Sequence, residues 1–360
     1  MNYIIYDLNY YEMINLDLSY MITTSHIILF VIILVIFVWI FAKNFWRIQL
    51  YFNTTGVSFY TPTTFSISDS QNRKQFDNLV KYGMNKMKSQ SVVICGLVRD
   101  VESQIPYIIQ KVERVANLFQ KYKILIVEND SKDNTRSLLL KWSEKNKNVI
   151  ILGCGVNQKE CKLNMPKTQA HEIERWRIEK MVKLRNEYIS YINSNLSDYD
   201  YCIVWDLDVI GIVYLDGIAN SIGWMNSNDL LTNESKIDSS EFSIDAICAN
   251  GIYKFASPSW AYVYYDTYAH LDYNEKYDIN NHFTHSLSKR IGCRYAFGEK
   301  LQKVKSCFSG FTIYRISSIK GLMYDMSPEN NLECEHVRFN RHLSNVYVNP
   351  SMIYRLLMNK

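Results

Sequence analysis

The stretch Asp198–Gly211, DYDYCIVWDLDVIG, decides the fold because two carboxylates directly follow an apolar run of strand length. The run YCIVW, residues 201–205, is typical of a buried strand. Asp206 and Asp208 come next, separated by one leucine. Ligands of open α/β sheets bind beyond the carboxyl ends of the strands. We therefore expect a central strand that places both aspartates in a ligand-binding crevice.

The two aspartates have the chemistry of a metal site. Asp206 and Asp208 project to the same side of an extended strand, where like charges repel unless a cation lies near them. Mg²⁺ or Mn²⁺ held by one or two carboxylates, water and substrate phosphate oxygens is the usual solution. A DxD tripeptide alone arises by chance, but after a buried strand it indicates a metal and diphosphate site. We expect Asp208 to contact the metal directly, and Asp206 to reach the ribose or a metal-bound water.

Outward from this stretch, strand-like and helix-like segments alternate. The apolar runs are SVVICGLV (91–98), YKILIVE (122–128) and NVIIL (148–152), and helices are expected over residues 105–120 and 134–145. Such alternation predicts βαβ units. The fold class is therefore α/β, a Rossmann-like, mostly parallel sheet with flanking helices.

Polar residues also follow the first two of these runs. Arg99 ends the first, although strands end in polar turns in any case. Glu128 and Asp130 lie at the end of the second, where their oxygens could accept hydrogen bonds from a nucleoside's base or ribose. Asp133 or Asn134 is expected to cap the following helix. Because polar residues follow three of the predicted strands, a donor-binding site is favoured over ordinary turns.

A helix is expected over residues 172–193, and it carries an arginine on its apolar face. Arg185 falls in the middle of a face formed by Ile178, Met181, Val182, Ile189 and Ile192. It either reaches the surface along that face or binds a diphosphate or carboxylate through its planar guanidinium. Asn186 is its polar neighbour at the edge of the same face.

Two later stretches supply further candidates. Ser309 and Gly310 lie between apolar runs, where small residues let a substrate approach the backbone. Glu333, Glu335 and His336 fall within four residues and suggest a base, a metal ligand or both, although His336 could instead be a satisfied structural histidine.

The chain before residue 91 divides into three expected segments. Residues 1–20 form a tail, 21–42 an uncharged apolar run of bilayer length, about 33 Å as a helix, and 43–90 a polar stem or linker. A buried core helix is the alternative for the apolar run. Lys43 and Arg47 follow it while no Lys or Arg precedes it, which favours a cytosolic catalytic domain over residues 91–360. Sequons at Asn53, Asn195 and Asn233 would instead suit a luminal one.

The composition limits the class of protein and the partners to be expected. The 360 residues are 48% hydrophobic and 21% charged, which predicts a folded protein, and a net charge of +4 gives no reason to expect nucleic acid as a partner. The eight cysteines include no CxxC pair. Their even number permits disulfides, whereas Cys95 and Cys202 are expected in buried strands as free thiols.

Six motifs in order give the sequence a family resemblance. VENDSKDNT, KLRNEYI, VWDLDV, YYDTYAH, SGFTIYR and ECEHVRF resemble the cryptococcal capsule-associated mannosyltransferase family, which includes α-1,3-mannosyltransferases with a GT-A-type fold. The resemblance covers about residues 91–349. It implies a nucleotide-sugar donor, a DxD-bound divalent cation and transfer to a sugar acceptor, and it favours GDP-mannose with retention of configuration.

The resemblance also implies roles for single residues. Glu128 and Asp130 look like nucleoside contacts, Arg185 and Asn186 like donor contacts, and His336 like the late histidine that completes metal coordination in many GT-A enzymes. Asp266 falls in a shared motif, and we assign it, with Ser309 and Gly310, to the donor or acceptor sugar. A membrane anchor with a stem agrees with the class, in which the catalytic domain is usually luminal.

The reaction expected is metal-dependent transfer of a hexose from a nucleoside diphosphate sugar to a glycan or glycoconjugate. The cation and Arg185 would stabilise the leaving diphosphate, and Glu333 or Glu335 would deprotonate the acceptor if the reaction inverts configuration. The alternatives are a metal-dependent nucleotidyltransferase or phosphatase, which would need a P-loop or more carboxylates, and a non-catalytic membrane-anchored carbohydrate-binding protein. Intact Asp206 and Asp208 argue against the last.

Overall fold

The computed structural model describes residues 26–40, 58–163, 173–227, 243–254, 262–276, 295–326 and 332–357. The chain divides into two compact units, Met1–Thr55 and Gly56–Lys360.

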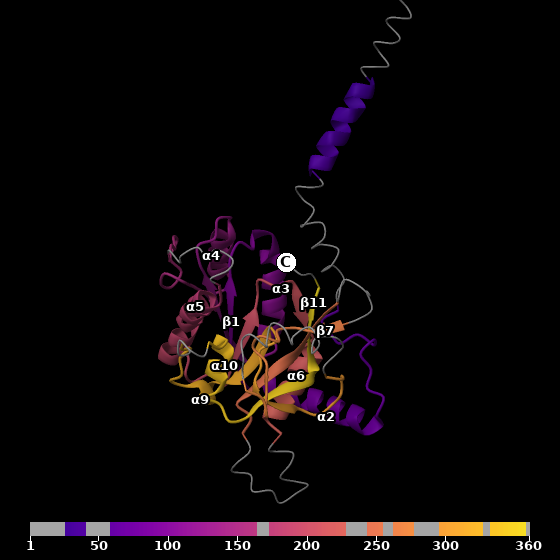
Figure 1. The fold of residues 1–360 in the computed structure, drawn as a ribbon, viewed down its shortest axis with the longest axis vertical. Helices are drawn as coiled ribbons and strands as arrows, with labels where there is room; N and C mark the ends of the chain where they lie inside the picture. Colours follow the sequence, from indigo (N-terminus) through magenta and orange to yellow (C-terminus); the bar gives the residue numbers. More distant parts are fainter. Residues whose placement is uncertain are drawn as a thin grey trace, which may run out of the picture. The chain divides into compact units, whose positions relative to one another are not determined.

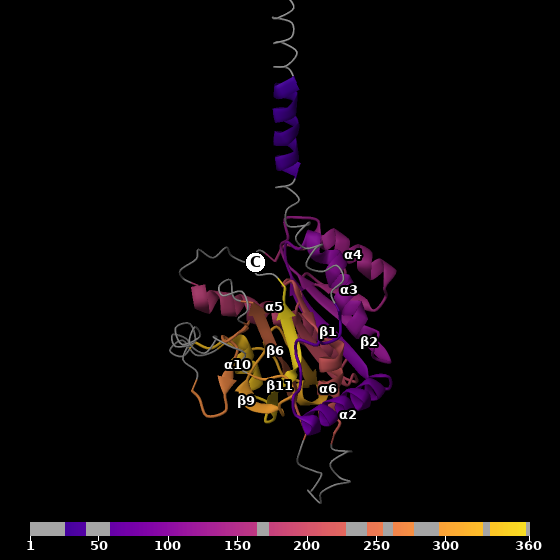
Figure 2. The ribbon, with the colours of Figure 1, turned by 90° about the vertical axis from the view of Figure 1, so that its right-hand side faces the viewer.

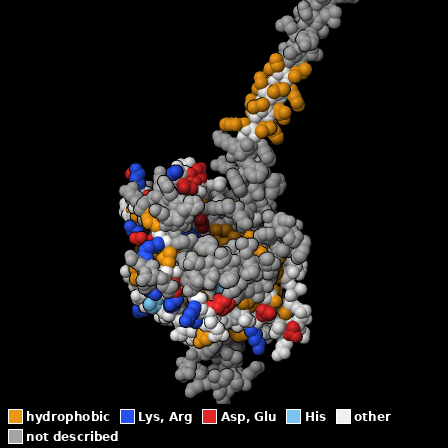
Figure 3. Space-filling view, in the orientation of Figure 1, with side chains coloured by type: hydrophobic (Ala, Val, Ile, Leu, Met, Phe, Trp, Pro, Cys, Tyr) orange, Lys and Arg blue, Asp and Glu red, His pale blue; other side chains and the backbone are white. Residues whose placement is uncertain are grey.

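The described part of the first unit is one helix over residues 26–40. Its large apolar side chains are exposed, including Phe30 and Trp39, and Figure 3 shows them covering the visible face of this helix. In the parts of the chain described here, no helix combines the length and the hydropathy needed to cross a membrane. The ends of the predicted membrane segment, residues 21–25 and 41–42, lie outside the described residues.

The second unit is built on one eleven-stranded sheet with the strand order β3-β2-β1-β4-β10-β6-β11-β9-β8, in which β5 also pairs with β11 and β7 with β6. The strands are β1 (Ser91–Val98), β2 (Lys121–Glu128), β3 (Val149–Leu152), β4 (Tyr201–Asp206), β5 (Gly211–Val213), β6 (Ala246–Lys254), β7 (Tyr262–Tyr264), β8 (Leu271–Asp272), β9 (Gln302–Ser306), β10 (Phe311–Arg315) and β11 (Val346–Leu356).

The direction of the strands follows the βαβ prediction. β3, β2, β1 and β4 are mutually parallel, and β6 and β11 form a further parallel pair. β10 is antiparallel to both β4 and β6, so it joins two blocks that run in the same direction. The chain reverses its order across the sheet between β1 and β4, which is where ligands bind in open α/β sheets.

Helices cover both faces of the sheet (Figures 1 and 2). The helices are α2 (Ser70–Met87), η1 (Glu102–Gln104), α3 (Ile105–Ala116), α4 (Thr135–Lys145), α5 (Ile173–Asn195), α6 (Leu215–Met225), α9 (Ile316–Ile319) and α10 (Glu335–Asn340). The core on one face includes side chains of α2, α3, α4 and α6, and the core on the other includes those of α5, α9 and α10. The predicted helices over 105–120, 134–145 and 172–193 correspond to α3, α4 and α5.

The structure differs from the sequence prediction at the stem. Residues 70–87, expected to be polar linker, form the 18-residue helix α2, which begins after the capping side chain of Asp69. α2 packs along α6 with Phe76, Leu79 and Met87 buried. Gly83 allows this approach, because a Cβ atom there would lie 1.8 Å from the Ala219 carbonyl oxygen. The globular unit therefore begins well before Ser91.

Two disulfides form among the described residues of this unit. Cys154 pairs with Cys161 near the end of β3, and Cys248 on β6 pairs with Cys307 just after β9. Cys95 and Cys202 are buried free thiols on the adjacent strands β1 and β4, as predicted.

Candidate active site

Asp206 ends β4 at the place the sequence predicts, and neighbouring strands hold its backbone. The Asp206 N–H donates to the Gly310 carbonyl oxygen at 2.8 Å, and the Tyr354 hydroxyl donates to the Asp206 carbonyl oxygen at 3.2 Å. Gly310 has a φ of +77°, and a Cβ atom there would lie 2.3 Å from the Tyr354 ring. Only glycine therefore fits beside Asp206.

The surroundings of Asp206 oppose its ionisation, chiefly through burial. Burial raises its pKa to about 8, against the lowering effect of Arg185 and with the added repulsion of Asp208 and Asp266. The Tyr265 hydroxyl donates to Asp206 Oδ2 at 3.3 Å. Asp206, Asp208 and Asp266, here called the aspartate cluster, thus interact electrostatically at the carboxyl end of β4, in surroundings that a bound cation would stabilise.

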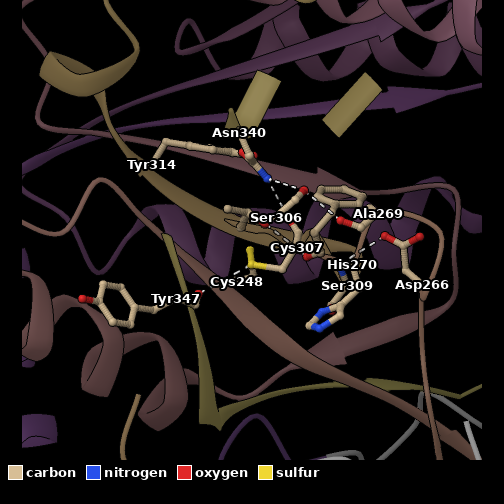
Figure 4. The surroundings of a disulfide bond; sticks show 12 residues. Cys248, Asp266, Ala269, His270, Ser306, Cys307, Ser309, Tyr314, Asn340 and Tyr347 are labelled. Carbon is tan, nitrogen blue, oxygen red and sulfur yellow. Dashed lines mark hydrogen bonds between the residues drawn. A yellow bond between two sulfur atoms is a disulfide. The ribbon is translucent and has the colours of Figure 1, made fainter. Parts of the chain in front are cut away.

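Asp266 belongs to this cluster, in a backbone conformation uncommon outside glycine. Its φ is +66°, and its Oδ2 accepts a hydrogen bond of 3.2 Å from the Ser309 N–H. Figure 4 shows Asp266 facing the loop of Ser309, next to Cys307 of the disulfide. Burial and the nearby Glu335 raise the pKa of Asp266 to about 7, against the opposing effect of Arg177 and Arg185. This carboxyl therefore changes protonation near neutral pH.

Arg185 points into the protein, as the helical wheel predicts, and pairs with Glu335. Its Nε lies 3.1 Å from Glu335 Oε1, and the two side chains are 5% and 6% exposed. The guanidinium also donates to the Tyr188 hydroxyl at 3.3 Å and lies over the Phe308 ring. Its field extends to Asp206. The pair thus connects the ECEH segment to the aspartate cluster.

His336 has a position that fits a bound group but not a closed metal site. It is 2% exposed, it stacks on Phe308 with ring centroids 3.9 Å apart, and neither ring nitrogen has a hydrogen-bond partner among the residues that the structure describes. Burial and Arg185 hold its pKa well below the usual range, so the ring is neutral and able to accept. Among the described residues, however, no three His, Cys, Asp or Glu side chains are grouped so that they could hold a metal ion. The paired oxygens of Asp206 and Asp208 fit Mg²⁺ or Mn²⁺, which need only one or two carboxylates.

Glu333 and Asn186 lie outside the aspartate cluster. The carboxylate of Glu333 pairs with Arg341 and lines a separate cavity. The Asn186 amide donates to the Tyr324 carbonyl and accepts from the Tyr324 N–H. This amide therefore holds the backbone of residue 324.

The predicted nucleoside residues hold the loop after β2. Glu128, 1% exposed, accepts from the Ser131 N–H at 2.9 Å and pairs with Arg136 at 2.7 Å. Asp130 has a φ of +51° and accepts from the Leu163 N–H at 2.8 Å. Their contacts with a nucleoside stay predictions.

Arg99, another of the predicted donor residues, follows β1 and is partly exposed. Its Nε lies 3.4 Å from Asp100 Oδ2, with the Arg99 side chain 39% exposed. Lys180 of α5 lies close enough that Arg99 lowers its pKa, in addition to the larger effect of burial. Two cationic groups therefore lie together beyond the end of β1.

Sequence reasoning missed Lys111 behind the aspartates. It is 1% exposed on α3, and its ammonium donates to the Val209 carbonyl at 3.0 Å. Burial lowers its pKa to about 7, against the opposing effects of Asp208 and Asp206. The ammonium thus holds the turn that follows Asp208. A lysine in an amphipathic helix carries no signal of this role, because such lysines normally face solvent.

The sheet places two aspartates beside its switch point, as a glycosyltransferase requires for its donor. The class is established by the sequence comparison, because a mannosyltransferase model matches residues 91–346. The chain belongs to this family, which is described as Cryptococcal mannosyltransferase 1. The resemblance inferred from the six motifs is thereby confirmed. No curated protein sequence matches that of the chain.

Two solved structures are similar at low identity. Residues 1–349 of S. aureus TarS, in complex with UDP-GlcNAc, are 11% identical with a TM-score of 0.41, over 75% of this chain and 59% of that chain. The mannosyltransferase PcManGT from Pyrobaculum calidifontis, in complex with GDP-Man and Mn²⁺, is 9% identical with a TM-score of 0.38, over 81% of this chain and 67% of that chain. The present chain therefore spans less than two thirds of the length of the TarS chain.

Proposed function

We propose that the chain transfers mannose from a nucleoside diphosphate sugar to a glycan or glycoconjugate acceptor, with Mn²⁺ or Mg²⁺ held by Asp206 and Asp208. The observation that carries the proposal is the position of Asp206 at the end of β4, where the charges of Asp208 and Asp266 act on it. Membership of a mannosyltransferase family supports the sugar, and GDP-mannose is the favoured donor.

Each residue near β4 has a distinct task in this proposal. When bound, the cation would neutralise the charge that develops on the leaving diphosphate. Tyr265 orients Asp206 through its hydroxyl. Asp266, whose carboxylate the Ser309 N–H holds in place, takes the proton of the acceptor hydroxyl. Arg185 fixes Glu335 beside it through a buried ion pair.

The test is release of nucleoside diphosphate by the full chain. With Mn²⁺ and a panel of nucleotide sugars, we expect GDP release from GDP-mannose in preference to UDP release from UDP-sugars. Asp208→Ala should abolish this release, whereas Asp198→Ala, a change at a 71% exposed side chain before β4, should not. Release of inorganic phosphate or pyrophosphate instead would favour a phosphatase or nucleotidyltransferase and contradict the proposal.

We propose further that residues 21–42 anchor the chain in a membrane as a single helix, with the catalytic unit in an oxidising, luminal compartment. The exposed apolar helix over residues 26–40 supports the anchor. The Cys154–Cys161 and Cys248–Cys307 disulfides support the compartment, because the cytosol keeps thiols reduced. This orientation is opposite to the one that Lys43 and Arg47 favour.

The exposed sequon at Asn195 gives the test of orientation. In a eukaryotic host, a luminal domain should carry a glycan that endoglycosidase removes and that Asn195→Gln eliminates. Glycan-free protein whose catalytic unit is digested by protease added outside intact microsomes would contradict the luminal assignment. Extraction of the protein by alkaline carbonate would contradict the anchor.

A further inference from the structure

A cavity lies at the edge of the sheet, lined by residues of β8 and β9 and by the end of α10. Its volume is about 740 Å³, within the range of small-molecule sites. Leu271, Val304 and Leu343 give its described lining an apolar part, and Tyr273 adds an aromatic ring that is 53% exposed. A ring accessible at the wall of a cavity offers a surface on which the C–H face of a sugar can stack.

A buried carboxylate adds hydrogen-bonding capacity to this cavity. Glu333 is 1% exposed and pairs with Arg341, whose side chain is 46% exposed. A carboxylate only accepts hydrogen bonds and a guanidinium only donates them, so together they match the hydroxyls of a sugar. This pair belongs to the lining and is not part of the aspartate cluster.

The charge of the lining selects against strongly charged ligands. Its described cationic residues are Lys276, Lys305 and Arg341, and its described acidic residues are Glu275 and Glu333. Lys305 is already engaged, since its ammonium donates to the Glu275 carbonyl at 2.8 Å. A nearly balanced set of charges beside an aromatic ring fits an uncharged sugar better than a phosphate.

The cavity adjoins the candidate active site through one short segment. Cys334 separates Glu333 from Glu335 and has an extended backbone, with φ −56° and ψ 140°. The Cα atoms of Glu333 and Glu335 are therefore about 7 Å apart. Glu333 lines the cavity, and Glu335 pairs with Arg185. The lining of the cavity and the Arg185–Glu335 pair are therefore separated along the chain by Cys334 alone.

We infer that this cavity binds the neutral hexose units of the acceptor glycan that lie beyond the unit receiving mannose. The inference rests on the proposed function, since it assigns the acceptor of the same reaction. Glu333 then contributes to acceptor binding at a distance from the reacting atoms, and Glu335 and Asp266 face the reacting unit.

Two substitutions of the lining test the inference in the full chain. Tyr273→Ala removes the ring, and Ser344→Trp places an indole in the cavity at an exposed position. We expect each to raise the KM for an α-mannotetraose acceptor about tenfold, while the KM for an α-mannobiose acceptor and GDP release without acceptor stay unchanged. Tyr60→Ala is the matched control, because Tyr60 is also exposed, at 55%, and is not among the residues that line the cavity.

Calorimetric titration with α-mannotetraose in the absence of donor separates this inference from the proposed function. Wild-type binding that both variants weaken supports the cavity even if no sugar nucleotide is hydrolysed. Wild-type GDP release together with an unchanged KM for mannotetraose in both variants overturns the inference and leaves the proposed function standing. The inference is also overturned if the wild type neither binds mannotetraose nor transfers to it.

Discussion

Removal of the Arg185 guanidinium should destabilise the globular unit by about 3–5 kcal/mol, because it leaves Glu335 buried without its counter-ion. The two side chains are 5% and 6% exposed and lie 3.1 Å apart, so solvent does little to weaken their attraction. In Arg185→Met, the carboxylate of Glu335 must either stay charged beside Asp266 or take up a proton. Both outcomes reduce the free energy of unfolding.

The double variant Arg185→Met/Glu335→Gln isolates the pair. If the cost of the single variant is that of a stranded charge, neutralising Glu335 as well should recover about 2 kcal/mol of it. The matched control is Lys121→Met, which breaks an ion pair with Asp198 that is 3.4 Å long but 56% and 71% exposed. That change should cost less than about 1 kcal/mol.

Urea denaturation of the four proteins at pH 7, followed by tryptophan fluorescence, gives these free energies. A loss below about 1 kcal/mol in Arg185→Met, equal to that of Lys121→Met, would refute the reasoning. A double variant as unstable as the single one would also refute it, since the loss would then come from packing against Phe308 and Tyr324 rather than from charge.

Three further changes test the surroundings of the site. The pKa of Asp206 is raised to about 8, so between about pH 4 and 8 the folded unit keeps a proton that the unfolded chain has lost. The free energy of unfolding without metal should therefore fall as the pH rises over this range. Urea denaturation in EDTA measures this fall, and Asp206→Asn should reduce it in part. Gly310→Ala should cost more than about 1 kcal/mol, since φ is +77° and Tyr354 occupies the space of a Cβ atom; an unchanged melting temperature would contradict this. Replacing both Cys248 and Cys307, 59 residues apart, by serine should lower the free energy of unfolding by about 4 kcal/mol. The same replacement of Cys154 and Cys161, seven residues apart, should lower it by about 2 kcal/mol, because the loop that this disulfide closes is shorter. Equal losses for the two pairs in urea denaturation would contradict this argument.

The sheet was predictable from the sequence because its strands are continuous apolar runs. β1, β2, β3 and β4 coincide closely with those runs, since a strand covered by helices on both faces needs apolar residues at every position. α2 was not predictable in the same way. Its contact with α6 depends partly on Gly83 facing Gly223 and Ala219, and a search for apolar periodicity does not count glycine.

The candidate site was predictable where residues follow a strand directly. Asp206 is such a residue, and β4 fixes its place. Asp266 was found only through the family resemblance, since it lies in a loop after β7 whose left-handed backbone and hydrogen bond from Ser309 have no sequence pattern. Glu333 and Glu335 were grouped because they are close in sequence, but the extended backbone of Cys334 just before α10 directs them to different surroundings.

The balance of charge around β4 explains why the fold can hold this cluster. Among the described residues, the cationic groups that act on the carboxylates of Asp206, Asp208, Asp266 and Glu335 include those of Lys111, Arg177 and Arg185. Without a ligand, burial and the repulsion among these carboxylates raise the pKa values of Asp206 and Asp266 to near neutrality. A divalent cation can replace the protons that these carboxyls hold and at the same time attract a diphosphate. The cost of holding these carboxylates close together is therefore recovered when donor and cation bind together, which is the state in which the proposed transfer takes place.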